Sequence, residues 1–175
     1  MKTTLTRWTV AAAALLPLAT QAFVLGATSP GKWGPAAMGT GATVTYSFMP
    51  TGVSCTAESV GCTIFSLLDF GPAFSVWRSE IAAAFDAWSA AADVTFVEVA
   101  DVGEAFDGLQ LSGDIRIGGH SIDGPGSSLA TGYLPPANGL SAAGDLHFDT
   151  GDCWEAAFDG TGDLCFSIFQ VTAHE

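Results

Sequence analysis

The sequence is poor in basic residues. Five of its 175 residues are Lys or Arg, against 18 Asp and Glu, so the formal net charge is -13. Affinity for nucleic acid is supplied by clustered Lys and Arg, and the composition therefore argues against a nucleic-acid partner. Two compatible explanations account for the acidity. It keeps the protein soluble, or its carboxylates bind calcium, a cation that requires oxygen ligands.

Long apolar runs are also missing. A bilayer span needs about 20 apolar residues, and no segment reaches that length. Residues 1–22 are typical of a secretory signal, with Lys2 and Arg7 near the start, an apolar stretch at 10–18, and small residues before Ala22. A short membrane anchor is the alternative, but the apolar stretch is too short for it. We expect a secreted chain without a membrane span. Its net charge after signal removal is -15, because three basic residues then face 18 acidic ones.

The spacing C-x-x-C is absent, which argues against a cysteine-based zinc cluster. The four cysteines of an exported chain are instead expected to form two disulfides. Three pairings are possible. Proximity in the sequence favours Cys55 with Cys62 and Cys153 with Cys165.

No internal repeat is visible, and about 150 residues after the signal suit one domain. Residues 23–43, rich in Gly, Pro and Ala, are predicted to be an extended lead-in. An amphipathic helix is predicted from Phe74 to Ala92, because apolar residues recur there at spacings of three and four. Its apolar positions are Trp77, Ile81, Ala84, Phe85 and Trp88. Strands are predicted at 44–49, 93–99, 113–118, 129–134 and 145–149. This order predicts a mixed sheet with the helix on one face.

Several short motifs occur in one order: V-T-Y-S-F, A-F-D-A-W, D-V-T-F-V-E-V, D-I-R-I, D-G-P-G, L-A, G-D-L-H-F-D and V-T-A-H-E. Together they resemble the catalytic domain of matrixins, the matrix-metalloproteinase branch of the metzincin zinc peptidases. The resemblance covers residues 44–175. It implies an α+β fold with a twisted, mixed five-stranded sheet, helices packed on one face, and a C-terminal subdomain missing from this chain.

The family's active-site motif is H-E-x-x-H-x-x-G-x-x-H, in which three histidines hold zinc and the glutamate takes a proton from the bound water. His174 matches the first histidine and Glu175 the glutamate. Two histidines four apart share one helix face and can bind one metal ion. Zinc lowers the pKa of water to about 7, which makes hydroxide available at neutral pH. The resemblance implies a secreted zinc metalloendopeptidase. With one zinc ligand, this 175-residue chain alone is expected to be inactive.

The resemblance also implies a calcium site around D-G-P-G. Asp123, Asp149 and Asp152 would supply carboxylates, and Gly124, Gly126 and Ser128 would supply backbone carbonyls. The family usually has Glu at the position of Asp152. Six oxygens, three of them charged, suit calcium. The alternative is that D-G-P-G forms only a tight turn.

A structural zinc site of the family, built from three histidines and an aspartate, is matched incompletely. His120 and His147 fall near two of its positions, but Thr131 stands where another histidine is expected. The segment from His120 to Asp123 is also too short for the usual separate aspartate. A closed zinc site needs four ligands. The two histidines are therefore either a depleted zinc site or ordinary hydrogen-bonding residues.

The segment from Ser128 to Tyr133 matches the family's edge strand. Leu129, Ala130 and Thr131 are expected to bind an extended protein or peptide substrate antiparallel, through main-chain hydrogen bonds. A protected edge without a ligand is the alternative. We expect a monomer. Two rival functions are a secreted, calcium-stabilised binding or adhesion domain without catalysis, and another metzincin branch with a different calcium loop.

Overall fold

The computed structural model describes residues 32–54, 74–106, 111–134, 142–156 and 165–175. The predicted signal at 1–22 and the predicted Cys55–Cys62 disulfide lie outside these residues. Within the described part, no helix is long and apolar enough to cross a membrane.

The main sheet has five strands in the order β2-β1-β3-β5-β4, which confirms the predicted mixed sheet. The strands are β1 (Ala42–Phe48), β2 (Val94–Glu98), β3 (Ile115–His120), β4 (Ala130–Gly132) and β5 (Leu146–Asp149). Strands β2, β1, β3 and β5 pair in parallel, while β4 runs antiparallel to β5 at the edge. A separate parallel pair joins β6 (Trp154–Glu155) to β7 (Phe166–Ser167).

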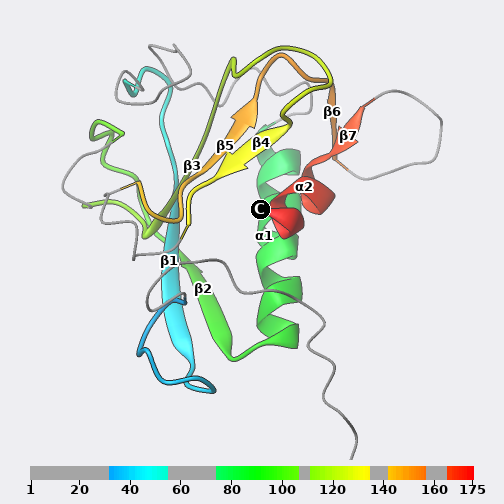
Figure 1. The fold of residues 1–175 in the computed structure, drawn as a ribbon. Helices are drawn as coiled ribbons and strands as arrows, with labels where there is room; N and C mark the ends of the chain where they lie inside the picture. Colours follow the sequence, from blue (N-terminus) through cyan, green and yellow to red (C-terminus); the bar gives the residue numbers. More distant parts are fainter. Residues whose placement is uncertain (1–31, 55–73, 107–110, 135–141, 157–164) are drawn as a thin grey trace, which may run out of the picture.

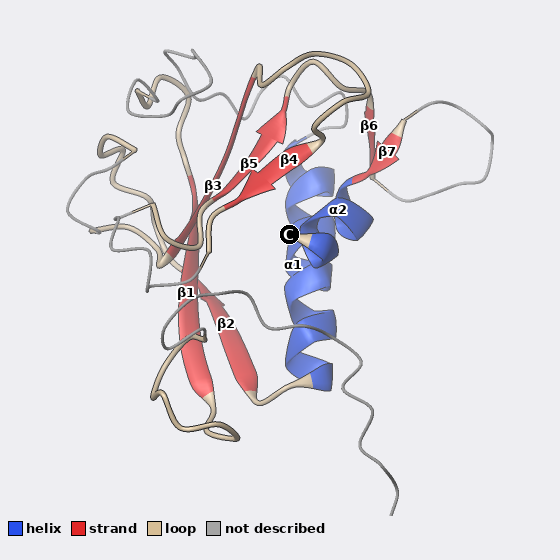
Figure 2. Ribbon diagram, in the orientation of Figure 1, coloured by secondary structure: helices blue, strands red, loops and turns tan. Residues whose placement is uncertain are grey.

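Two helices lie on one side of the sheet (Figures 1 and 2). Helix α1 (Phe74–Ala91) connects β1 to β2, and the short helix α2 (Ile168–His174) follows β7. The two helices contact each other, and the Trp88 indole N–H donates to the carbonyl of Ala173 at 3.1 Å. Helix α2 is therefore held between α1 and the β4 edge, where the chain's last residue also lies (Figure 1).

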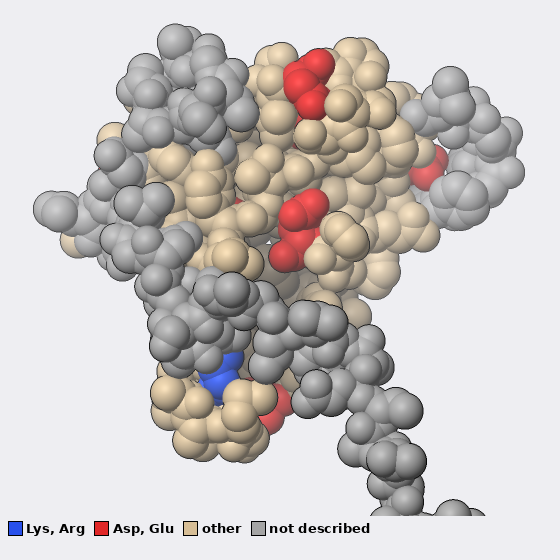
Figure 3. All heavy atoms as spheres, viewed as in Figure 1, with Lys and Arg blue, Asp and Glu red and all other residues tan. Residues whose placement is uncertain are grey.

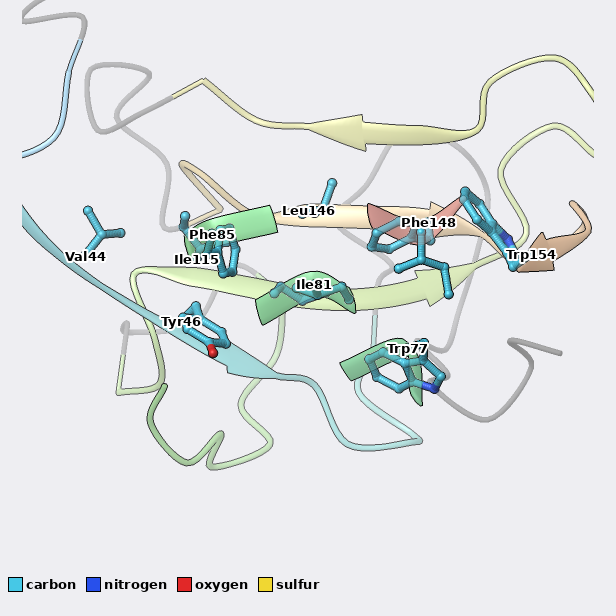
Figure 4. Close-up of a cluster of buried hydrophobic side chains, with 11 residues drawn as sticks. Val44, Tyr46, Trp77, Ile81, Phe85, Ile115, Leu146, Phe148 and Trp154 are labelled. Atoms are coloured by element: carbon cyan, nitrogen blue, oxygen red, sulfur yellow. The ribbon is translucent and has the colours of Figure 1, made fainter. Parts of the chain in front are cut away.

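The core fills the space between the sheet and α1 (Figure 4). The Phe85 ring lies 4.7 Å from Tyr46 and 4.5 Å from Phe96, centroid to centroid. The buried cluster consists of Val44, Tyr46, Trp77, Ile81, Phe85, Ile115, Ile117, Leu146, Phe148, Trp154 and Ile168. One predicted member of the buried helix face differs. Trp88 is 50% exposed, and its indole N–H donates to the Ala173 carbonyl at the end of α2.

The ends of three strands differ from the sequence prediction, because they depend on which residues pair with a neighbouring strand. β1 begins two residues earlier, since Ala42 is the register partner of Val94. β3 extends to His120, which pairs with Asp149. The predicted strand at 129–134 is reduced to the three residues of β4, because its pairing with β5 covers only those three.

Candidate functional site

Helix α2 presents His174 on its open side. The helix begins at Ser167, whose hydroxyl oxygen accepts from the Gln170 N–H at 3.4 Å and caps the first turn. Ile168 and Thr172 are buried against the rest of the protein, and the Thr172 hydroxyl donates to the Ile168 carbonyl. Gln170 and His174, four residues apart, are exposed. Because the face of α2 with Ile168 and Thr172 is buried, the opposite face with Gln170 and His174 points to solvent.

Glu175 lies against the edge strand. A Cβ atom built on Gly132 would be 3.0 Å from Glu175 Oε2 and 3.3 Å from its Cβ. The glutamate can approach this closely because Gly132 has no side chain. One edge of β4 pairs with β5, and β4 is the last strand of the sheet. The predicted base therefore lies beside the strand predicted to bind substrate.

A groove of about 1160 Å³ runs between β4 and α2. Its lining includes the predicted zinc ligand His174, the predicted base Glu175, and two of the three residues predicted to bind substrate, Leu129 and Ala130. Thr131, also predicted to bind substrate, does not line it. The groove is also lined by residues whose place in it no short motif predicts, among them Pro125, Phe166, Gln170 and Val171.

Glu175 also borders a second hollow, of about 200 Å³, together with Trp33 and Trp88. A Cβ atom on Gly144 would lie 2.4 Å from the Trp33 ring, so Trp33 packs closely on the segment before β5. The sequence places Trp33 in a lead-in without a predicted role. Nothing in its local pattern indicates this long-range contact.

The loop predicted to bind calcium is assembled by hydrogen bonds. Asp149 Oδ2 accepts from the N–H groups of Asp123 at 3.0 Å and Gly124 at 2.9 Å. Asp152 Oδ1 accepts from the Gly126 N–H at 2.6 Å. The Asp123 carboxylate accepts from the Ser128 N–H and hydroxyl, at 3.1 and 2.9 Å. All six predicted residues thus belong to one hydrogen-bonded loop pair, which we call the acidic loop.

These contacts favour ionised carboxylates. Burial raises the pKa of Asp149, but backbone hydrogen bonds from Asp123, Gly151, Ile122 and Gly124 outweigh it, and the pKa falls below its ordinary value of 3.8. Hydrogen bonds from Ser128 lower the pKa of Asp123 in the same direction. Asp152 is 9% exposed, and its Oδ2 atom has no hydrogen-bond partner within the described residues.

The described ranges contain no group of three or more His, Cys, Asp or Glu side chains placed to hold a metal ion. In the acidic loop, the N–H groups of Gly124 and Gly126 donate to the carboxylates of Asp149 and Asp152. Carboxylate oxygens are suitable ligands for calcium, and the buried Asp152 Oδ2 atom has no hydrogen-bond partner among the described residues. At the end of α2, His174 stands as a single candidate ligand.

His120 and His147 lie together, with ring centroids 5.5 Å apart. Thr131 is the register partner of His147 across β4 and β5, so a threonine faces the pair at the expected third position. The rings of Phe106 and Tyr133 lie 4.9 and 5.7 Å from the His147 ring. Thr131, Phe106 and Tyr133 add no third histidine, cysteine or carboxylate to the pair within the described residues. Both interpretations of the two histidines, a depleted zinc site or ordinary hydrogen-bonding residues, stay predictions.

The Cys153–Cys165 disulfide is present, with a Cα–Cα distance of 4.5 Å, as predicted. The Phe166 N–H donates to the Cys153 carbonyl at 2.8 Å, and the Trp154 indole N–H donates to the Asp149 carbonyl at 2.7 Å. This segment therefore ties the acidic loop to the start of α2.

The sequence of the chain is similar to those of known proteins. The family model described as Matrixin matches residues 65–175. The hatching enzyme of Paracentrotus lividus is 33% identical over 99 residues, which cover 56% of this chain and 15% of that protein. Interstitial collagenase of Oryctolagus cuniculus is 34% identical over 96 residues, 53% of this chain and 18% of that protein. Karilysin of Tannerella forsythia is 30% identical over 98 residues, 56% of this chain and 20% of that protein.

The match includes the helix α1, the sheet from β2 onward, the acidic loop and the His174-Glu175 pair. The chain spans at most a fifth of the length of these relatives. Because the family model covers more than half of the sequence, and the fold agrees with it, the chain belongs to the matrixin family.

Proposed function

We propose that the protein containing these residues is a secreted zinc metalloendopeptidase that binds extended protein or peptide substrates in the groove between β4 and α2. One observation carries the proposal. In a matrixin chain, His174 and Glu175 border the same groove as the edge strand, and Glu175 touches that strand at Gly132. The proposed zinc ligand and general base therefore lie beside the strand that would bind the peptide backbone.

Each residue has a distinct role in this proposal. His174 is a zinc ligand, and zinc in such a site supplies Lewis acidity and lets water act as a nucleophile near neutral pH. The outer edge of β4, which pairs with no other strand of the described residues, orients the peptide by main-chain hydrogen bonds, with Leu129 and Ala130 beside it. Glu175 accepts the proton of the attacking water and passes it to the leaving amine.

We also infer that the acidic loop binds calcium through Asp123, Asp149 and Asp152, together with carbonyls of Gly124, Gly126 and Ser128. The three carboxylates supply charged oxygens, and the leftover Asp152 Oδ2 atom is buried with no hydrogen-bond partner among the described residues. A carboxylate has about four lone-pair sites, so each of these groups can accept its N–H bonds and still bind the ion. Calcium would stabilise the fold and take no part in the reaction.

Secretion is supported by the predicted signal at 1–22 and by the Cys153–Cys165 disulfide, which requires an oxidising compartment. We propose that residues 44–175 belong to the catalytic domain of a monomer.

The test expresses the longest open reading frame that contains these 175 residues and measures hydrolysis of a quenched peptide mixture. Glu175→Gln should lower kcat by about 100-fold or more, the usual contribution of a general base, while bound zinc stays unchanged. His174→Ala should lose both zinc and activity. A chelator should abolish hydrolysis, and added zinc should restore it.

Glu80→Gln is the matched control, because Glu80 lies on α1 and does not line the groove. It should retain full activity. Hydrolysis that survives Glu175→Gln would contradict the proposed base. Zinc binding and calcium-dependent stability without any hydrolysis would support the alternative of a non-catalytic binding domain.

A further inference from the structure

The Cys153–Cys165 disulfide lies in the wall of the groove between β4 and α2. Cys153 is exposed and Cys165 is half-buried. Thiol–disulfide exchange requires that a thiolate reach one of the two sulfur atoms, so exposed disulfides are the labile ones. A small thiol in solvent can therefore reach this bond from the groove.

The disulfide restrains two very short strands and the helix that follows them. β6 and β7 have two residues each, and so short a strand pair has little stability of its own. The Phe166 N–H donates to the Cys153 carbonyl at 2.8 Å, so the covalent bond and this hydrogen bond act on the same segment. Ser167, the second residue after Cys165, caps the first turn of α2. Opening the disulfide is therefore expected to loosen the start of the helix that presents His174.

Buried residues on both sides keep the two cysteines near each other without the bond. Trp154, which follows Cys153, is 5% exposed, and its indole N–H donates to the Asp149 carbonyl at 2.7 Å. Ile168, three residues after Cys165, is 1% exposed and belongs to the main core. Because these contacts do not involve the sulfur atoms, opening the bond should leave the sheet folded and should allow the same bond to form again.

We propose that the Cys153–Cys165 disulfide is a site of reversible thiol–disulfide exchange with dithiols, and that its reduction releases the β6–β7 pair and the first turn of α2 while the main sheet stays folded. The groove wall is then a redox-sensitive control on the position of α2. The proposal rests on the accessibility of the bond and on what it restrains, and it is independent of the proposed peptidase function.

The exchange has two steps, and the dithiol supplies both electrons. One thiolate of the dithiol attacks the Cys153 Sγ atom, the protein S–S bond breaks, and Cys165 leaves as a thiolate. The second thiolate of the reagent then attacks its own sulfur in the mixed disulfide, which closes the reagent's disulfide and releases Cys153. The two protein thiolates take up the two protons that the dithiol loses. A monothiol stops at the mixed disulfide, from which the neighbouring Cys165 expels it.

The first measurement asks whether the bond opens in the folded protein. The longest gene product that contains these residues is treated with dithiothreitol or with the same concentration of glutathione thiol, alkylated under native conditions, and analysed by mass spectrometry. Dithiothreitol should label both Cys153 and Cys165, and glutathione should label them about tenfold less or weaker still. A bond that dithiothreitol opens only in denaturant would overturn the proposal.

The second measurement asks what the open bond releases. After reduction, backbone amides of the segment from Phe166 to Gln170 should exchange hydrogen about tenfold faster or more, because the local opening of this segment has lost its covalent restraint. Amides of β5 should change by less than about twofold, and reoxidation should restore the slow exchange. Equal acceleration in β5 would mean that reduction unfolds the protein, and no acceleration at Phe166 to Gln170 would mean that the bond restrains nothing. Either result contradicts the proposal.

Two variants assign the response to this bond. Cys153→Ala with Cys165→Ala should exchange fast at the start of α2 with or without dithiothreitol. Cys55→Ala with Cys62→Ala is the matched control, because it removes the other two cysteines, which lie outside the described residues, and it should keep the full response. If the first double variant does not fold, the matched control still decides, since a response lost from it would assign the effect to Cys55 and Cys62 and overturn the proposal.

Discussion

Within the described residues, two of the regions with buried acidic side chains neutralise them differently. Near the start of β3, Asp101 binds Arg116 at 2.9 Å, with both side chains at most 3% exposed. In the acidic loop, the hydrogen bonds to Asp149 and Asp152 come from backbone N–H groups. One region carries its own cation. The other gathers ionised oxygens that a bound cation could neutralise, which is why we assign calcium there and not at Asp101.

The charged groups of Asp101 and Arg116 also make more hydrogen bonds to side chains than the carboxylates of the acidic loop do. The Arg116 guanidinium binds both oxygens of Asp101 and donates to the carbonyls of Glu104 and Ala105. The Ser47 hydroxyl adds a bond from β1. By contrast, the acidic loop leaves Asp152 Oδ2 without a partner in the described residues. On the face in Figure 3, acidic atoms lie in several places, while basic atoms are confined to the lower part of the view.

The largest expected effect comes from removing the internal cation. Arg116→Met leaves Asp101 buried without its charge partner and should lower the free energy of unfolding by about 3–5 kcal/mol, measured by urea denaturation. Arg78→Met is the matched control, because the Arg78–Glu98 pair is 41% and 33% exposed and should cost no more than about 1 kcal/mol. Similar losses for both variants would contradict the contrast between buried and exposed pairs.

The next effect tests whether the acidic loop takes a cation from solution. With the affinity of a typical extracellular calcium site, 10 mM calcium should raise the free energy of unfolding by about 1.4–2.7 kcal/mol. Thermal denaturation with calcium or with a chelator measures it. Asp149→Asn should remove the response, and Asp86→Asn, on the exposed side of α1, should keep it. A chain equally stable in both conditions would leave D-G-P-G as a turn alone.

A smaller effect of opposite sign is expected for Asp152→Asn in chelator. The substitution removes a buried charge whose Oδ2 atom lacks a hydrogen bond, so stability without calcium should rise by about 1 kcal/mol. The same variant should respond less to calcium. Denaturation of the wild type and the variant, each with and without calcium, gives both numbers. Loss of stability in chelator would mean that the negative charge of Asp152 stabilises the fold without calcium, because asparagine keeps an oxygen that can accept from the Gly126 N–H.

The sequence predicts one of these two regions better than the other. The acidic loop can be predicted because D-G-P-G and the later aspartates are local motifs with a known family pattern. The bond between Asp101 and Arg116 joins residues 15 positions apart in a segment without periodicity, and no local pattern indicates it. Helix α1 could be predicted because its apolar residues repeat within a few positions.

The same difference separates the candidate site from its surroundings. His174 and Glu175 could be identified because they are neighbours in a short motif. The contact of Glu175 with Gly132 and the place of Phe166 in the groove depend on how β4, β7 and α2 pack. Strand ends such as His120 depend on pairing in the same way. Long-range packing is set by the whole chain, so short patterns do not reveal it.

The smallest expected difference between the two acidic regions is in how the stability of the protein changes at low pH. Burial raises the pKa of Asp101, but hydrogen bonds from Arg116, Gly103 and Ser47 outweigh it, so its pKa in the folded protein is lower than the ordinary 3.8. A lowered folded pKa means that the unfolded chain binds the proton first. The stabilisation from Asp101 is therefore complete above the unfolded pKa of about 4 and is lost as pH falls through the lower folded value.

Urea denaturation in chelator at several pH values between 6 and 2.5 measures this loss. A variant with Asp101→Leu and Arg116→Met together should show a shallower fall of stability below pH 4, because it lacks the carboxylate while leaving no unpaired charge. The double variant should also be more stable than Arg116→Met alone. An unchanged slope below pH 4 would show that the acid sensitivity comes from other carboxylates, and that the paired region is not the one that protons disrupt.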